Sequence, residues 1–247
     1  WTYSNLTCTT GASSDEMAAG NVAGDDSTGA DTLRSIEGVQ GTIFADTYVA
    51  TGFGQAGAAN VGNNGGFNQF EGMAGDDSIT GNGSTRVIYT NATSGVTVHL
   101  AAGTANGDAS VGTDTFTGVN SAGGSNFADT FDAAGFVGFN AFQGMGGNDT
   151  IIGGAGVNSA ASFSGTPSQY NFAGLTFDAN QLASGTISGP DGSDTLTGVG
   201  ALKFGTTYYV LPGMSIQKAI DDASNGDTIE IAAGTYTEQL LIDGKNL

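Results

Sequence analysis

GMAGDDSIT at residues 72–80 and GMGGNDTII at residues 144–152 are the two stretches that decide how this chain folds. Each contains two glycines three positions apart, then a polar residue, an aspartate, a hydroxyl residue and an apolar residue. Glycine permits backbone dihedral angles that other residues avoid, so each stretch predicts a tight turn followed by a short strand. If such turns stack, aspartates and turn carbonyls line up and supply the oxygen ligands that a hard cation prefers.

A smaller unit recurs along the chain: an aspartate, then Ser or Thr, then an apolar or aromatic residue. We interpret each copy as a turn that leads into a strand, with the hydroxyl residue on the opposite face from its apolar neighbour. Turns that contain Gly and Asp are common in any β protein. Seven copies with the same kinds of successor residue nevertheless favour one repeated unit, and they begin at Asp31, Asp46, Asp77, Asp114, Asp129, Asp149 and Asp194.

A longer internal repeat contains these units. Residues 24–33 match residues 107–116, and residues 41–48 match residues 124–131, both at an offset of 83 residues. The two glycine-rich stretches follow at an offset of 72, so the second copy has a shorter intervening loop. A repeat of this kind is typical of a solenoid or a repeat array.

The charge balance limits the possible partners. Among 247 residues there are 24 Asp+Glu and only 5 Lys+Arg, which gives a formal net charge of −19. This balance excludes nucleic acid as a partner and argues against anionic membranes, and no segment is long and apolar enough to insert into a bilayer. Acidity alone also serves solubility, but the recurring context of the aspartates favours a metal. A lone cysteine, Cys8, excludes an intrachain disulfide and leaves bound metal as a candidate staple.

The glycine-rich stretches resemble the calcium-binding nonapeptide G-G-x-G-x-D-x-U-x of RTX (hemolysin-type) proteins, in which U is a large apolar residue. Met73 and Met145 stand where the second glycine belongs, so the repeats are degenerate. The resemblance covers residues 24–160 and implies Ca²⁺ as the bound ion. The ligands that it implies are Asp77 and Asp149, with backbone oxygens of Gly72, Gly75, Gly144 and Gly147, then Asp46 and Asp129, then Asp31, Asp114 and Asp194.

The same resemblance implies that the protein is secreted. RTX proteins leave bacteria by type I secretion, and calcium outside the cell drives their folding. The expected location is therefore extracellular or on the surface of a bacterium. At turns where calcium is absent, hydrogen bonds between Asp and Thr are the alternative stabilising contact.

The segment 161–210 has a different character. Its stretch GPDGSDTLTGV at residues 189–199 resembles the module that closes a block of RTX repeats. Aromatic residues at positions 163, 170, 172 and 177 fit either a core or a platform that binds carbohydrate. We favour a role in the core over one in carbohydrate binding. The sole histidine, His99, lies in a different segment and is predicted on the polar face of a strand.

The last segment predicts a helix over residues 214–223, capped by Ser215, with Ile216, Ala219 and Ile220 on one face. Strands are predicted over residues 228–231 and 238–242. The segment resembles the first turn of a right-handed parallel β-helix of the pectate-lyase-like class, in which a helix covers the open end. One turn cannot bury its own apolar face, so we expect further coils or a stacking partner.

Together these patterns predict an all-β fold: a parallel β-solenoid (β-roll or β-helix) with loop excursions and one short capping helix near the C-terminus. The expected domains are residues 1–160, 161–210 and 211–247. The sequence contains no convincing group of catalytic residues. Its adjacent aspartates are poor acid–base pairs, because neighbouring residues on a strand point to opposite faces. The sequence favours a non-enzymatic, calcium-binding structural protein, a surface-layer, adhesin or filament subunit that self-associates or joins an extracellular matrix. The alternative is an accessory module of a secreted polysaccharide-active β-helix enzyme.

Overall fold

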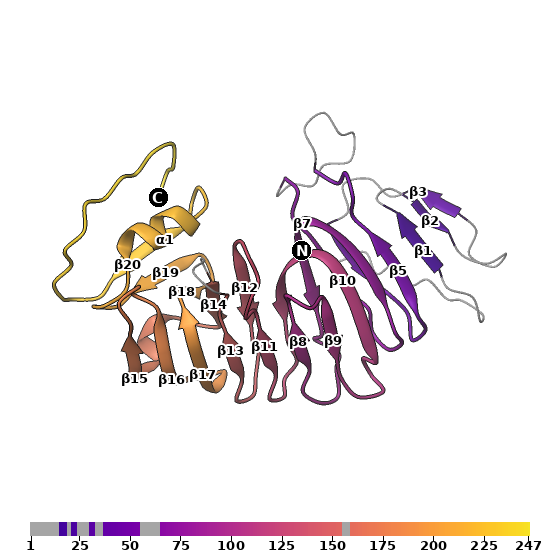
Figure 1. The fold of residues 1–247 in the computed structure, drawn as a ribbon, viewed down its shortest axis with the longest axis horizontal. Coiled ribbons are helices and arrows are strands. Elements are labelled where there is room, and N and C mark those ends of the chain that lie inside the picture. The colour runs from indigo at the N-terminus through magenta and orange to yellow at the C-terminus, as the bar shows by residue number, and fades with distance from the viewer. Residues whose placement is uncertain (1–14, 19–20, 24–29, 33–36, 55–64, 155–158) are drawn as a thin grey trace. The chain divides into compact units, whose positions relative to one another are not determined.

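The computed structural model describes residues 15–18, 21–23, 30–32, 37–54, 65–154 and 159–247. In these residues the chain is all-β, with parallel and antiparallel strand pairs in a mixed sheet that is not closed. It divides into two compact units, residues 1–126 and 127–247, so both expected domain boundaries, at 160 and 210, fall inside the second unit. The elements are labelled in Figure 1.

The first unit contains two parallel rows of strands that share β7 and β10. One row runs β1–β5–β7–β10, and the other runs β4–β6–β7–β10, because the two long strands each pair along both of their halves. The hairpin partners β2, β3, β8 and β9 are antiparallel. The strands are β1 Asp15–Ala18, β2 Asn21–Ala23, β3 Ala30–Thr32, β4 Gly38–Gln40, β5 Asp46–Val49, β6 Asn68–Glu71, β7 Ser78–Ile88, β8 Thr97–His99, β9 Thr104–Asn106 and β10 Thr113–Gly123.

The second unit repeats this plan. One parallel row is β11–β13–β17, and the other is β12–β14–β18. Beyond β17 the sheet adds β16 and then β15 in antiparallel order, while β18 is followed by β19 and then β20. The strands are β11 Thr130–Asp132, β12 Asn140–Gln143, β13 Thr150–Ile152, β14 Ser159–Phe163, β15 Asn171–Phe177, β16 Ala183–Gly189, β17 Gly192–Val199, β18 Ala201–Phe204, β19 Thr207–Val210 and β20 Thr228–Ile231.

Apolar side chains at matching positions of neighbouring strands build the core of each unit. In the first unit Tyr48 pairs with Ile79, and Ile79 pairs with Phe116. In the second unit, Phe131, Ile151 and Leu196 occupy the same register. All six side chains are buried. The parallel register stacks each apolar residue on its counterpart, and this stacking buries an inner face that no single short strand could bury alone.

The predicted helix is confirmed, and one predicted strand is wrong. Helix α1 spans Ile216–Asp222, and Ser215 caps it by accepting a hydrogen bond from the Lys218 N–H. Residues 238–242 form no strand. The Glu238 carboxylate instead accepts hydrogen bonds from the N–H groups of Ile216 (3.0 Å) and Gln217 (3.1 Å) at the N-terminal end of α1.

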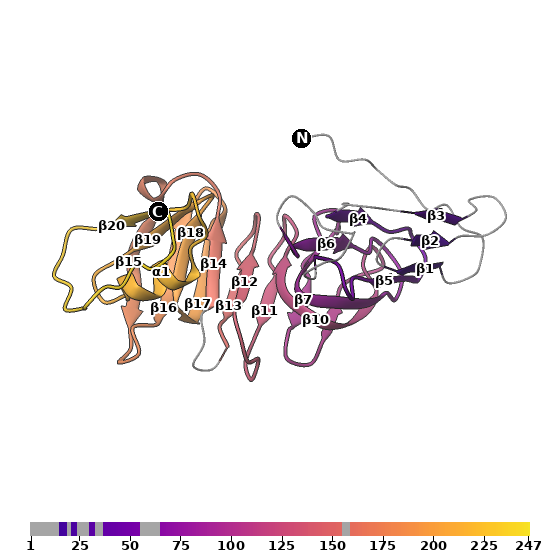
Figure 2. The same ribbon diagram turned by 90° about the horizontal axis from the view of Figure 1, so that it is seen from above.

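The other end of α1 is held by a second contact from the C-terminal segment. Lys245 Nζ donates to the carbonyl oxygens of Ile220 and Asp221, both at 2.6 Å. An acidic group at the start of a helix and a basic group at its end both complement the helix dipole. The C-terminal segment therefore runs across α1 and binds both of its ends, which explains why it does not pair as a strand. Figure 2 shows this segment beside α1 from a second direction.

No helix in the described ranges has the length and apolar character needed to cross a membrane.

Candidate functional site

The aspartates predicted as metal ligands form a column inside the first unit. Asp46, Asp77 and Asp114 each stand at or just before the start of a strand in one parallel row, and each is at most 3% exposed. The Asp46 N–H donates to Asp77 Oδ1 (2.8 Å), and the Asp77 N–H donates to Asp114 Oδ1 (3.0 Å). The carboxylates of Asp77 and Asp114 thus each satisfy a backbone donor of the preceding member of the row, while that of Asp46 accepts the Thr42 N–H (2.6 Å) in its own turn.

The second unit contains a matching column of Asp129, Asp149 and Asp194. The Asp129 N–H donates to Asp149 Oδ1, and the Asp149 N–H donates to Asp194 Oδ1, both at 2.8 Å. All three side chains are buried. The structure therefore brings six of the seven predicted aspartates into two columns, three in each unit. Asp31 lies in β3, but its side chain is outside the part of the chain that the structure describes.

The strand period explains why these aspartates point inward. Side chains two residues apart share a face of a strand. Asp77 and Ile79 are therefore both buried, while Ser78 between them is exposed. The sequence-based interpretation placed the apolar residue inside, and its burial confirms this. The metal-binding role that it gave to the carboxylate stays a prediction, and the strand period places that carboxylate beside the core.

The residue before the middle aspartate of each column accepts a hydrogen bond from the following member of the row, in the opposite direction to that aspartate. Asp76 Oδ1 accepts a hydrogen bond from the Thr113 N–H, and Asn148 Oδ1 accepts one from the Ser193 N–H, both at 2.9 Å. Because an asparagine replaces an aspartate here without loss of the bond, this position needs an acceptor and not a charge. Each glycine-rich stretch is thus tied to the strands on both of its sides.

The glycines of the motif make room for these carboxylates. A Cβ atom on Gly72 would lie 1.6 Å from Asp77 Oδ2, and a Cβ atom on Gly144 would lie 1.8 Å from Asp149 Oδ2. Gly75 and Gly147 have φ angles of +113° and +122°, and a Cβ atom on either would lie 2.5 Å from a backbone carbon of the neighbouring turn. Residues with side chains cannot take these positions without displacement of the neighbouring atoms.

Met73 and Met145 also adopt left-handed backbone conformations, with φ angles of +71° and +75°. They occupy the position where the nonapeptide pattern has its second glycine. A left-handed conformation at a residue with a side chain costs on the order of 1 kcal/mol. The turn geometry is therefore maintained at both positions in spite of the substitution.

Burial makes these carboxyl groups weak acids. Desolvation raises the pKa of Asp77 to about 8 and that of Asp149 to about 7, and it raises those of Asp114 and Asp194 to about 6. Neighbouring carboxylates raise the pKa of Asp77 further, while the hydrogen bond from the Asp46 N–H lowers it. The Tyr89 hydroxyl donates to Asp114 Oδ2 (3.0 Å). The second oxygens of Asp77 and Asp149 are buried and have no hydrogen-bond partner.

As they are placed, the columns do not fit a calcium cage. Calcium takes six to eight oxygen ligands. In the columns, Oδ1 of Asp77, Asp114, Asp149 and Asp194 each accept a backbone N–H, and the free oxygens of Asp77 and Asp149 pack against glycines. No group of three or more His, Cys, Asp or Glu side chains suited to a metal ion occurs within the described ranges. Calcium binding stays a prediction, and these residues act here as hydrogen-bond acceptors.

A second row of buried polar residues was missed by the sequence analysis. Asn68 is fully buried, and its Oδ1 accepts hydrogen bonds from the hydroxyls of Tyr48 (3.2 Å) and Thr85 (2.8 Å). Asn140 occupies the same place in the second unit, but its Oδ1 has no hydrogen-bond partner. Phe131 stands there in the position of Tyr48 and lacks the hydroxyl. Asn68 and Asn140 share the offset of 72 residues, so the repeat itself was the available signal.

The aromatic residues of segment 161–177 lie mostly in the core of the second unit. Phe163 and Tyr170 are buried, and their rings lie 5.4 and 5.0 Å from the ring of Phe204. Phe172 is half-buried and lies 5.2 Å from Tyr209. These contacts account for the aromatic residues as core packing.

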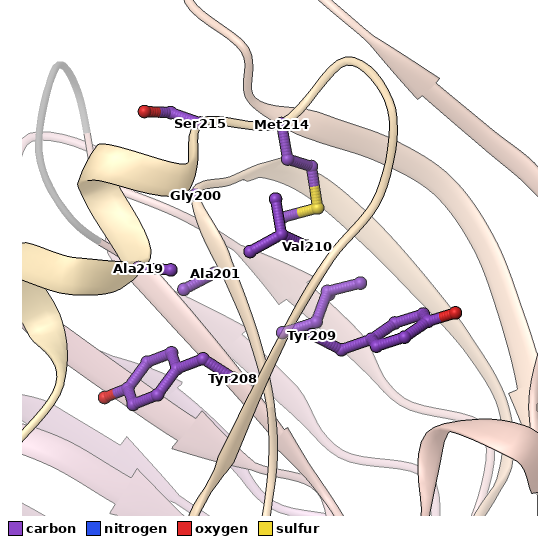
Figure 3. Close-up of a pocket in the computed structure, with 9 residues that line it drawn as sticks. Gly200, Ala201, Tyr208, Tyr209, Val210, Met214, Ser215 and Ala219 are labelled. Atoms are coloured by element: carbon purple, nitrogen blue, oxygen red, sulfur yellow. The ribbon is translucent and has the colours of Figure 1, made fainter. Parts of the chain in front are cut away.

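A shallow recess lies between α1 and the β18–β19 hairpin. Figure 3 shows Met214 beside Val210, with Tyr208 and Tyr209 on opposite sides of their strand. No part of the recess is wide enough to admit a water molecule. It is a packing gap with a largely apolar lining, and such gaps stay dry.

Comparison with known proteins does not assign the chain to a family. No protein-family model matches it, and the search of curated proteins finds no significant match.

Proposed function

We propose that this chain is a non-enzymatic structural protein, a stretch of parallel β-solenoid that serves as a scaffold on a bacterial surface or in an extracellular matrix. The carboxylate columns carry this proposal. Groups that could serve acid–base chemistry are instead buried and bonded to the backbone of adjacent strands. Because every such bond links one strand to its neighbour, the aspartates hold successive coils together by hydrogen bonds.

The repetition of these hydrogen bonds favours a scaffold over a protein with a single active or binding site. The same contacts occur in both units, and the glycines that admit them recur with the same spacing. Repeat architectures stabilise each coil by its neighbours, so a rigid rod can be lengthened without a new core design. Such a rod suits a surface-layer, adhesin or filament subunit.

Calcium enters the proposal as an ion bound outside the columns. The formal charge of −19 opposes folding through self-repulsion, and a divalent cation would reduce it most effectively. If calcium binds at exposed carboxylates, folding would be favoured in the extracellular medium, as type I secretion requires.

The test is a calcium titration of the metal-free protein, followed by circular dichroism and thermal melting. We expect millimolar CaCl₂ to raise the melting temperature more than MgCl₂ or NaCl of equal ionic strength. An equal increase in melting temperature with all three salts would show that calcium acts only by screening charge. Calcium would then not be part of the proposed function.

A variant with both Asp77→Asn and Asp149→Asn tests whether calcium binds inside or outside the aspartate columns. Calcium bound outside the columns predicts that this variant keeps the calcium-specific increase of the wild-type protein. Loss of the increase in a variant that still folds would instead make the columns the calcium sites.

A further inference from the structure

The second unit leaves a strand edge open, and we propose that β15 (Asn171–Phe177) pairs in antiparallel fashion with β15 of a second copy of this chain. The inference rests on the proposed structural function and names the surface through which the scaffold would assemble.

Strand β15 is an edge strand among the strands that the structure describes. It pairs with β16 only, whereas β16 pairs with both β15 and β17. Figure 1 shows β15 beyond β16 at the end of the row β17–β16–β15. A row of backbone donors and acceptors along such an edge is a template for an added strand.

The edge also lacks most of the features that normally prevent pairing, with one bulge as the exception. Proteins protect edge strands with charged residues, prolines or very short length. Strand β15 has seven residues, NFAGLTF, with no charge and no proline. The other edge strand of this unit, β20, is shorter, with four residues, and carries Glu230. In a chain with 24 acidic residues, an edge strand with neither charge nor proline is an available pairing surface.

One feature limits the length of the pairing. The register between β15 and β16 shifts between Asn171 and Gly174, and the Ala173 N–H is already bonded to Asn171 Oδ1 (3.0 Å). Bulges of this kind twist an edge away from its neighbour. The added strand would therefore pair chiefly along residues 174–177.

The self-complementarity of the uncharged strand favours a second copy as the partner. Two acidic surfaces repel each other, but antiparallel pairing of β15 with itself places an uncharged strand opposite an uncharged strand. The half-buried side chains of Phe172, Leu175 and Phe177 would meet the same residues across a two-fold axis. The nearest charge, the exposed Asp178, lies just beyond the strand. A short strand pair buries less than the roughly 800 Å² per partner of a standard interface, so the association should be weak.

The test is sedimentation equilibrium of the full chain with two substitutions at one exposed position. Thr176→Glu places like charges near each other across the two-fold axis. Thr176→Val stays uncharged and, like Thr176→Glu, removes the hydrogen bond that the Thr176 hydroxyl gives to the Ser184 carbonyl (3.1 Å). We expect a reversible dimer for the wild-type chain and for Thr176→Val, and at least about tenfold weaker association for Thr176→Glu. Circular dichroism confirms that both variants fold.

The outcomes separate this inference from the proposed function. A wild-type chain that stays monomeric overturns the inference, and so does a dimer that Thr176→Glu leaves unchanged, because a different surface would then form it. Neither result affects the calcium titration, which tests the proposed function on the single chain.

Discussion

At Gly72, the space for a methyl group is already taken by a carboxylate oxygen. A Cβ atom there would lie 1.6 Å from Asp77 Oδ2, and the carboxylate cannot move without breaking its hydrogen bond to the Asp46 N–H. We expect Gly72→Ala to lower the free energy of unfolding by about 3 kcal/mol or more, as measured by urea denaturation.

Gly38 provides the matched control for this substitution. It also lies in the first unit, but the nearest atom to an added Cβ is Nε2 of the flexible Gln69 side chain, at 3.4 Å. Gly38→Ala should change the free energy of unfolding by less than about 1 kcal/mol. Equal effects of the two substitutions would contradict the role assigned to Gly72.

Phe131 offers a test in which the expected effect is stabilising. In the first unit the Tyr48 hydroxyl donates to Asn68 Oδ1 (3.2 Å), while the equivalent Asn140 Oδ1 has no partner beside Phe131. The rings are similarly stacked, with Phe131 5.2 Å from Phe142 and Tyr48 4.9 Å from Phe70. We expect Phe131→Tyr to raise the free energy of unfolding by about 1 kcal/mol, since it satisfies a buried acceptor.

The reverse substitution in the first unit completes the comparison. Tyr48→Phe removes one of the two donors to Asn68 Oδ1, leaving the Thr85 hydroxyl, and should cost up to about 1 kcal/mol by thermal or chemical denaturation. If Phe131→Tyr instead destabilises the chain, the hydroxyl does not reach Asn140, and the two units differ in this part of their cores.

The sequence predicted which residues matter more reliably than it predicted what they do. The recurrence of Asp before Ser or Thr identified the column aspartates, because a repeated backbone geometry demands repeated residues. Their role could not be read from the motif alone, since Asp77 accepts its hydrogen bond from a strand 31 residues earlier. The strand period did contain the missing information, because it places Asp77 and Ile79 on one face.

At the level of the element, each column should make stability depend on pH. Burial raises the pKa of Asp77 from 3.8 to about 8, while the unfolded chain ionises near the ordinary value. The stabilising contribution is therefore complete below about pH 4 and is lost as the pH rises through about 8. We expect the melting temperature of the wild-type chain to fall between about pH 5 and pH 8. Asp77→Asn, which cannot ionise, should flatten this decline.

Asp76→Asn is the control for this pH experiment. Asp76 is exposed, and the chain itself carries asparagine at the equivalent position, where Asn148 makes the same bond to a backbone N–H. This variant should keep most of the decline between pH 5 and pH 8, because the Asp76 charge is only the smallest of the causes that raise the pKa of Asp77. A decline that both variants abolish, or that neither alters, would show that Asp77 is not its source.

Helices and strands were predicted best where a local sequence pattern alone determines them. Ser215 and the apolar spacing that follows it identified α1 nearly to its ends. Residues 238–242 look like a strand by composition, but Glu238 binds the start of α1 and Lys245 binds its end. Such contacts lie 20 or more residues apart in the sequence, and local periodicity contains no information about them.

For the whole molecule, the charge of the chain should govern the proposed pairing through β15. Two copies that pair through β15 bring together two chains of formal charge −19, although the paired strands themselves are uncharged. Salt screens repulsion between exposed charges, with a Debye length of about 10 Å at about 0.1 M. We therefore expect the dimer to tighten by about tenfold or more as NaCl rises from about 30 mM to about 300 mM. The measurement is sedimentation equilibrium across that range.

The direction of this salt effect distinguishes the proposed pairing from one built on ion pairs. Attraction between opposite charges weakens as salt is added, whereas pairing of backbone groups and apolar side chains against a background of repulsion strengthens. Thr176→Glu adds one more negative charge to each copy at the interface, so its weaker dimer should gain more from added salt than that of Thr176→Val. Association that weakens with NaCl would point to contacts between the few basic residues and acidic surfaces, and it would exclude β15 as the main contact.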